Sequence, residues 1–161
     1  MKEFNISSSI FAYDSIEELP DALERDLCKA SIKARESAYA AYSKFSVGSA
    51  LLLDNHELLS GSNQENAVYP LGLCAERVAI FSANTQYPES KILKLAVSTS
   101  AQEADHDYPA FPCGSCRQVL SEQEVRFAND IKVLVVAANQ RVFVMNSIKD
   151  ILPFTFTKDL L

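Results

Sequence analysis

The sequence of 161 residues is short of glycine, and this shortage excludes two large classes of nucleotide-binding protein. It holds only four glycines, and no two of them lie close enough to build a glycine-rich loop. Both the P-loop and the dinucleotide fingerprint need closely spaced glycines, because the backbone must approach the phosphates. We therefore expect no phosphate cradle of either kind.

Long apolar stretches and an excess of basic residues are also missing. The longest uninterrupted apolar run, residues 133–138, is far shorter than the ~18–20 residues of a membrane span. The N-terminus lacks the basic start and apolar stretch of a secretory signal. The formal net charge is −6, which argues against a polyanionic partner, since nucleic-acid binding neutralises phosphates with Lys and Arg. We expect a cytoplasmic protein with neither membrane nor nucleic-acid partners.

The chain is nevertheless rich enough in apolar residues, at 48%, to bury a full core. Its length fits one domain over residues 1–161, with residues 1–14 as a loose N-terminal arm. Apolar spacing predicts helices over residues 23–41, 74–83, 113–127 and 147–152. Strands are predicted over residues 45–53, 57–62, 92–98, 131–138 and 140–145. This order indicates an α/β layered domain around one mixed sheet.

The four cysteines carry the clearest chemical signal. Cys113 and Cys116 form a Cys-x-x-Cys pair preceded by Pro112, and Cys74 lies 39 positions upstream of Cys113. Three thiols can fill three corners of a zinc tetrahedron and leave the fourth for water, as in a catalytic zinc site. Cys74 and Cys113 each fall at a predicted helix N-terminus, where unpaired N–H groups stabilise thiolates. Cys116 lies on the same helix face as Cys113, one turn later.

Two other uses of these thiols stay open. A Cys-x-x-Cys pair can be a redox dithiol, but in thioredoxin-like proteins that motif belongs to a βαβ setting, whereas here a loop precedes it. A structural four-cysteine zinc site would recruit the remaining thiol, Cys28. Because Cys28 falls beside the apolar stripe of the first predicted helix, we expect it to be an inert buried thiol.

Glu76 distinguishes a catalytic metal site from a structural one. It follows Cys74 by two residues in the first turn of a predicted helix, where it can face the open position of the metal. A carboxylate there can take a proton from zinc-bound water and return it to a leaving group. The alternative is an acidic residue that only stabilises a helix N-terminus.

In combination, the two cysteine motifs resemble the zinc-binding signature of the nucleobase deaminases. Flanking segments narrow the resemblance to the cytidine deaminases; these are residues 42–48, 63–67, 69–77 and 112–119, with the C-terminal region from residue 152. The resemblance runs from about residue 30 to the end. It implies a three-layer α/β/α domain with about five strands, one Zn²⁺ per chain and a homotetramer. It also implies hydrolytic deamination of cytidine and 2′-deoxycytidine in pyrimidine salvage.

This resemblance assigns a metal centre and its immediate surroundings. Cys74, Cys113 and Cys116 would bind zinc, Glu76 would be the proton shuttle, and Arg77 would donate to the thiolates. Charge supports the last role, because Zn²⁺ with three thiolates leaves −1 on the site and the adjacent guanidinium can offset it. A solvated helix arginine is the alternative for Arg77.

The resemblance also assigns a nucleoside pocket. Phe45 would pack against the pyrimidine, and the backbone of Ala75 would hold the carbonyl oxygen of the base. Asn63 and Glu65 would bind the ribose hydroxyls; they are two apart, so on an extended segment they face the same way. A carboxylate there would repel a phosphorylated sugar and favour a nucleoside. Plain core packing of Phe45 and an ordinary polar loop at 63–65 are the alternatives.

Subunit contacts are implied for Tyr69 and Phe156, which would reach a neighbouring subunit's site. The chain departs from the family pattern at Ser46, where proline is expected, and at Phe111, where a small hydroxyl residue is usual.

Two rival functions also stay open. One is a related aminohydrolase for another cytosine-containing substrate, such as an antibiotic nucleoside or a nucleic acid. The other is a non-catalytic zinc-stabilised binding protein.

Overall fold

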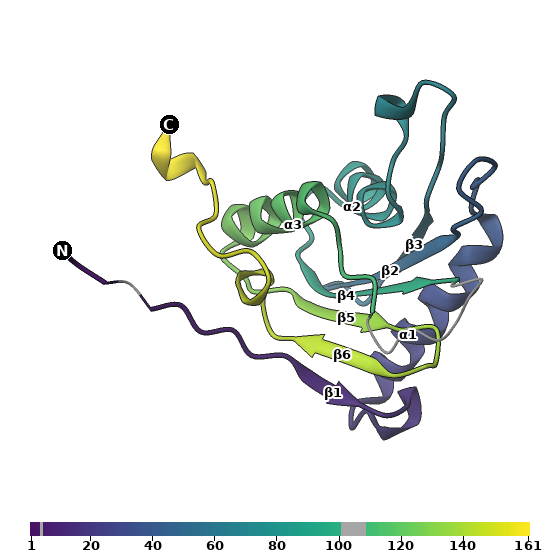
Figure 1. Cartoon of the computed structure of the whole chain (residues 1–161), viewed down its shortest axis with the longest axis horizontal. Coiled ribbons are helices and arrows are strands. Elements are labelled where there is room, and N and C mark those ends of the chain that lie inside the picture. Colours follow the sequence, from purple (N-terminus) through teal and green to yellow (C-terminus); the bar gives the residue numbers. More distant parts are fainter. Residues whose placement is uncertain (4, 101–108) are drawn as a thin grey trace.

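Six strands form one mixed sheet through the centre of the protein, in the order β1-β6-β5-β4-β2-β3 (Figure 1). The computed structural model describes residues 1–3, 5–100 and 109–161. The strands are β1 (Phe11–Tyr13), β2 (Val47–Leu53), β3 (Leu58–Ser62), β4 (Ile92–Thr99), β5 (Lys132–Val136) and β6 (Val142–Met145). β4 and β5 are parallel, and the other described neighbours pair antiparallel.

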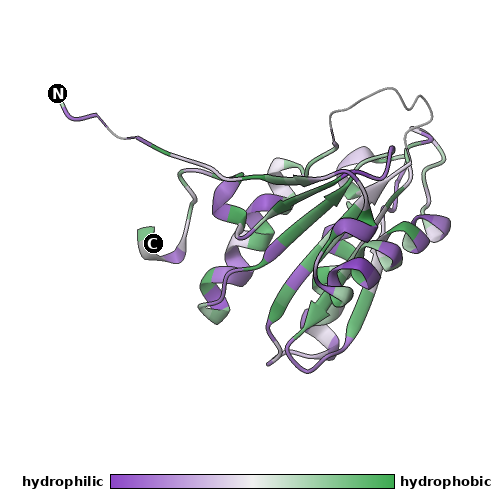
Figure 2. Cartoon of the chain, turned by 90° about the horizontal axis from the view of Figure 1, so that it is seen from below, coloured by the Kyte–Doolittle hydropathy of each residue, from purple (hydrophilic) through white to green (hydrophobic). Residues whose placement is uncertain are grey.

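Helices cover both faces of this sheet. α1 (Ala22–Ala34) lies on one face, and α2 (Ala75–Gln86) and α3 (Gly114–Phe127) lie on the other (Figure 1). Side chains alternate between faces along a strand, so β2 sends Leu51 toward α2 and α3 and Leu52 toward α1. Figure 2 shows the hydrophobic strands between helices that carry hydrophilic stretches. The expected three-layer α/β/α architecture is confirmed.

The number of strands differs from the expected five because the N-terminal segment adds one. β1 pairs antiparallel with β6 and lies within residues 1–14, the segment expected to be a loose arm. Three residues carry too little periodicity to indicate a strand from sequence, and the pairing partner lies about 130 positions away.

The first helix ends earlier than its apolar stripe predicts, at Ala34 instead of about residue 41. The chain continues from there as a 3₁₀ turn over Arg35–Ser37. The Arg35 side chain donates from Nε to the Ile32 carbonyl and from Nη1 to the Thr99 carbonyl, so it ties the end of α1 to the end of β4. The last predicted helix, residues 147–152, is a short 3₁₀ turn over Ile148–Asp150.

No helix in the described ranges has both the length and the apolar character that crossing a membrane requires.

Close contact between β3 and α2 sets the position of the helix that begins beside Cys74. A Cβ added at Gly61 of β3 would lie 2.6 Å from the Ala79 backbone nitrogen and 2.7 Å from the Ala75 carbonyl oxygen. Only glycine allows the strand to approach the helix backbone so closely.

We expect Gly61→Ala to destabilise the fold by about 1–3 kcal/mol, because the new methyl group meets backbone atoms that cannot turn aside. Gly114→Ala is the matched control, since a Cβ at that position meets no atom within 4 Å. Urea unfolding of both zinc-loaded variants measures the difference. Equal stability of the two variants would show that β3 and α2 can separate without cost.

Candidate metal centre and active site

Two helix N-termini bring the three thiols of the cysteine motifs together. Cys74 immediately precedes α2, Cys113 immediately precedes α3, and Cys116 lies in the first turn of α3. The Cys74 and Cys113 sulfurs are 3.8 Å apart, and the Cys113 and Cys116 sulfurs are 3.6 Å apart. Tetrahedral zinc with Zn–S bonds of ~2.3 Å separates its sulfurs by ~3.8 Å. The cluster therefore has the dimensions of a zinc site.

The surroundings of these thiols favour a negative charge on sulfur. The pKa of Cys74 falls to about 5, because a thiol hydrogen bond from Cys116 and the nearby Arg77 stabilise the thiolate. The Nη2 atom of Arg77 lies 3.7 Å from the Cys74 sulfur. In return, the Cys74 thiolate raises the pKa of Arg77, so the guanidinium stays charged. Arg77 thus lies where the sequence places it, against a thiolate.

Cys28 lies on the other side of the sheet from the three-thiol cluster. It is fully buried in α1, and burial raises the pKa of its thiol to about 12. A protonated thiol behind the sheet cannot serve as a fourth ligand of the cluster. The structure therefore favours an open fourth position over a four-cysteine structural site.

We expect Cys116→Ser to lose most of its zinc, and Cys28→Ser to retain one zinc per chain, because only the first thiol belongs to the cluster. Metal analysis of the two purified variants, after dialysis against a weak chelator, measures this. Zinc loss on replacing Cys28 would favour the structural four-cysteine site instead.

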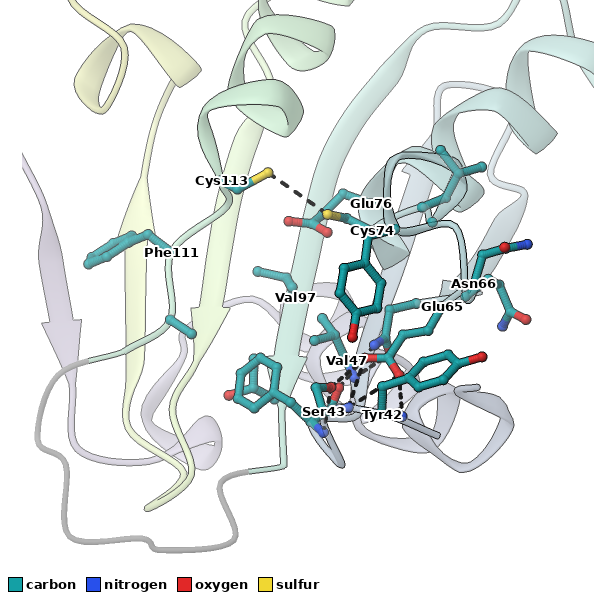
Figure 3. A pocket seen from close by; sticks show the side chains of 18 residues that line it. Tyr42, Ser43, Val47, Glu65, Asn66, Cys74, Glu76, Val97, Phe111 and Cys113 are labelled. Atoms are coloured by element: carbon teal, nitrogen blue, oxygen red, sulfur yellow. Dashed lines mark hydrogen bonds between the residues drawn. The ribbon is translucent and has the colours of Figure 1, made fainter. Parts of the chain in front are cut away.

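Glu76 places a buried carboxylate beside the thiols. It is the second residue of α2 and only 4% exposed. Burial raises its pKa to about 6, and the Cys74 thiolate adds to that rise. Figure 3 shows the carboxylate in the cavity wall next to Cys74 and facing the side of Cys113. The geometry thus supplies a carboxyl group able to hold or release a proton next to a metal site.

A cavity of about 570 Å³ opens in front of the cluster and Glu76. It gathers most of the residues expected at the site, namely Phe45, Asn63, Glu65, Tyr69, Cys74, Glu76 and Cys113. Ala75 is buried as the first residue of α2, where its N–H has no partner within the helix. Cys116 and Arg77 do not line the cavity but contact the sulfurs of Cys113 and Cys74, which do.

The two residues expected to bind ribose both contact the backbone around Phe45. The Asn63 Nδ2 donates to the Phe45 carbonyl at 2.9 Å, and its Oδ1 accepts from the Val47 N–H at 2.8 Å. Glu65 accepts from the Tyr42 N–H at 2.8 Å and from Ser43 (Figure 3). The hydrogen bonds to Glu65 lower the pKa of its carboxyl group. Sequence spacing places both residues on one face but does not indicate these contacts.

Two aromatic residues at the cavity make ring contacts that the sequence does not indicate. Tyr69 lines the cavity of its own chain and meets Tyr42 edge-on, with ring centroids 6.0 Å apart. Phe111, where a small residue was expected, is one of the residues that line the cavity (Figure 3), and its ring packs edge-on against Phe143 of β6.

Phe156 lies outside the cavity of its own chain. Its side chain is 58% exposed, and its carbonyl accepts a hydrogen bond from Gln118 of α3. Phe154 is more exposed still, at 86%. The structure therefore does not bring Phe156 together with the other residues expected at the site.

Arg117 holds the second cysteine motif in place, a role that sequence reasoning missed. Its Nε donates to the Pro112 carbonyl and its Nη1 donates to the Ile151 carbonyl, both at 2.7 Å. It thereby ties the loop before Cys113 to the C-terminal segment. Its position directly after Cys116 is the only signal in the sequence.

Comparison with known proteins places this site in a family. Residues 22–129 match the family model described as the cytidine and deoxycytidylate deaminase zinc-binding region. The cytidine deaminase of Halalkalibacterium halodurans is 47% identical over 96 residues, which cover 60% of this chain and 68% of that protein. That of Sporosarcina psychrophila is 36% identical over 129 residues, covering 80% and 88%.

A solved structure agrees with these matches. The crystal structure of cytidine deaminase from Burkholderia pseudomallei superposes with a TM-score of 0.69 at 36% identity, covering 81% of this chain and 97% of that one. Fold and thiol cluster together define a zinc-dependent protein that binds one Zn²⁺ per chain. This chain belongs to the cytidine and deoxycytidylate deaminase family.

Proposed function

We propose that this protein is a zinc-dependent cytidine deaminase, which hydrolyses cytidine and 2′-deoxycytidine to uridine and 2′-deoxyuridine and releases ammonia. The observation that carries the proposal is the buried Glu76 carboxylate beside three thiols at the end of a cavity. Phe45 and Glu65 lie in the rest of that cavity and offer an aromatic face and a carboxylate. The names of the related proteins support the same activity.

The side chains of Cys74, Cys113 and Cys116 would be the three protein ligands of the metal. When bound, Zn²⁺ lowers the pKa of a water in its fourth position and so supplies a nucleophile near neutral pH. Three thiolates exceed the charge of the metal by one, which would weaken this effect. Arg77, at 3.7 Å from the Cys74 sulfur, offsets that excess.

Glu76 moves the protons of the reaction. Its carboxylate accepts a proton from the attacking water and delivers it to N3 of the ring, while the water oxygen forms a bond to C4. A second proton, from the new hydroxyl group, then passes through Glu76 to the amino group. The C4–N bond breaks and ammonia leaves, so the carboxylate returns to its starting state.

The cavity residues orient the nucleoside for this attack. Phe45 offers its ring to the face of the pyrimidine, and the free N–H of Ala75 can donate to the carbonyl oxygen of the base. Asn63 and Glu65 bind the sugar hydroxyls. The negative charge of Glu65 repels a sugar phosphate, which favours a free nucleoside over a nucleotide.

We expect Glu76→Gln to retain zinc and lose cytidine turnover by at least about 10²-fold, because the amide cannot accept and return a proton. The loss of cytidine absorbance measures turnover, and metal analysis measures zinc. Glu57→Gln, in the exposed hairpin turn between β2 and β3, is the control and should keep full activity. Full activity of Glu76→Gln would refute the proposed mechanism.

The proposal extends to assembly and location. We propose a homotetramer in which Tyr69 and Phe156 reach neighbouring subunits, and a cytoplasmic role in pyrimidine salvage. Val68, Tyr69 and Leu71 are all more than half exposed and adjoin the cavity mouth, as expected for an interface. None of the four cysteines forms a disulfide bond, which is typical of proteins in a reducing compartment.

Light scattering is expected to give the mass of four chains for the zinc-loaded protein. Leu71→Asp should lower that mass, because burying the new charge between subunits is unfavourable. A monomeric wild type with full activity would refute the proposed assembly and leave the chemistry intact.

A further inference from the structure

The loop that carries Phe45 is fastened to Glu65 through Ser43. The Ser43 hydroxyl donates a hydrogen bond to Oε1 of Glu65, and the Ser43 backbone N–H reaches both carboxylate oxygens at 3.3–3.4 Å. The same hydroxyl accepts the Phe45 N–H at 3.1 Å. One side chain thus connects the carboxylate with the backbone of Phe45 (Figure 3).

The loop needs such fastening because its backbone is unusual. Lys44, between Ser43 and Phe45, has φ of 59°, a left-handed conformation that a side chain disfavours. Its N–H donates to the Ala40 carbonyl at 3.1 Å, and its Nζ donates to the Ala41 carbonyl at 2.7 Å. The turn that sets the direction of Phe45 is therefore held by hydrogen bonds on both sides.

Counting acceptor sites shows what remains for a ligand. An ionised carboxylate has about four lone-pair sites. The Tyr42 N–H, the Ser43 N–H and the Ser43 hydroxyl occupy three of those on Glu65. One site is left for a sugar hydroxyl, and its direction is fixed by the three bonds already made.

We propose that Ser43 is a positioning residue for sugar recognition, which aims the Glu65 carboxylate at the sugar hydroxyls and ties that carboxylate to the loop that presents Phe45. The inference rests on the proposed function. Its physical basis is preorganisation: a carboxylate already held by three donors loses little freedom when a fourth arrives. Three donor contacts of Ser43 reach the Glu65 carboxylate and one contact reaches Phe45, so its effect should be largest for substrates that carry sugar hydroxyls.

Steady-state kinetics with two substrates tests this role. We expect Ser43→Ala to raise KM for cytidine about 10-fold, in line with loss of a hydrogen bond to a charged group, and to change kcat by less than about threefold. The same variant should lose clearly less affinity for 2′,3′-dideoxycytidine, since that substrate lacks the hydroxyls that Glu65 binds and is affected only through the Phe45 loop. Ser43→Thr keeps the hydroxyl group and should restore most of the affinity.

A double variant separates this role from a merely structural one. Ser43→Ala should cost much less in the Glu65→Gln background than in the wild type, because most of its effect passes through the carboxylate. Ser46→Ala is the matched control, because no hydrogen bond of its side chain exists in the described structure, and it should leave both substrates unaffected. Zinc content and thermal midpoints confirm that all variants are folded.

The outcomes distinguish the two proposals. A folded, zinc-loaded wild type that does not turn over cytidine refutes the proposed function and this inference with it. An active wild type refutes the inference alone in two cases. One is a Ser43→Ala loss that is equal for cytidine and 2′,3′-dideoxycytidine, and the other is a loss that adds in full to that of Glu65→Gln.

Discussion

The convergence of two helix N-termini on one face of the sheet is the constraint on which the site depends. α2 and α3 begin at Cys74 and Cys113, whose sulfurs lie 3.8 Å apart although 39 residues separate them in the chain. Parallel pairing of β4 with β5 makes this possible, because α3 lies in the crossover between them on the face that α2 already covers. Both helix dipoles then favour negative charge at the same point.

The buried carboxyl group of Glu76 beside the thiols distinguishes a catalytic metal site from a structural one. Glu76 sits one residue into α2, so the helix that presents Cys74 also presents the carboxylate. The surrounding protein buries this group, and burial raises its pKa to about 6. Arg77 lies behind the thiols and balances their charge, whereas Glu65 lies at the far end, where its hydrogen bonds keep it ionised. One cavity therefore holds two carboxyl groups in opposite electrostatic settings.

The sequence predicts local features of the fold and site well, but it predicts contacts between distant segments poorly. Cys74 and Cys113 are placed at helix starts by their motifs, and the layered α/β domain with one mixed sheet follows from the order of elements, whereas the three layers are implied by the family resemblance. Asn63 and Glu65 are placed on one face by their spacing, but their hydrogen bonds to residues 42–47 join segments about 20 positions apart. β1 is missed because three residues show no period. The end of α1 is missed because the apolar spacing continues to Ala38, past the change to a 3₁₀ turn over Arg35–Ser37.

The pairing of β1 with β6 has a consequence for how copies of the chain can associate. The edge of a sheet is a row of unsatisfied N–H and C=O groups, and such rows invite strand addition and aggregation. Here the outer side of β6 is already paired over Val142 to Val144 by residues 11–13 of the same chain. The edge that β1 itself presents is only three residues long, too short to template a partner strand. This side of the molecule is thereby closed to growth by sheet extension, so β3 is the edge of the sheet that stays open.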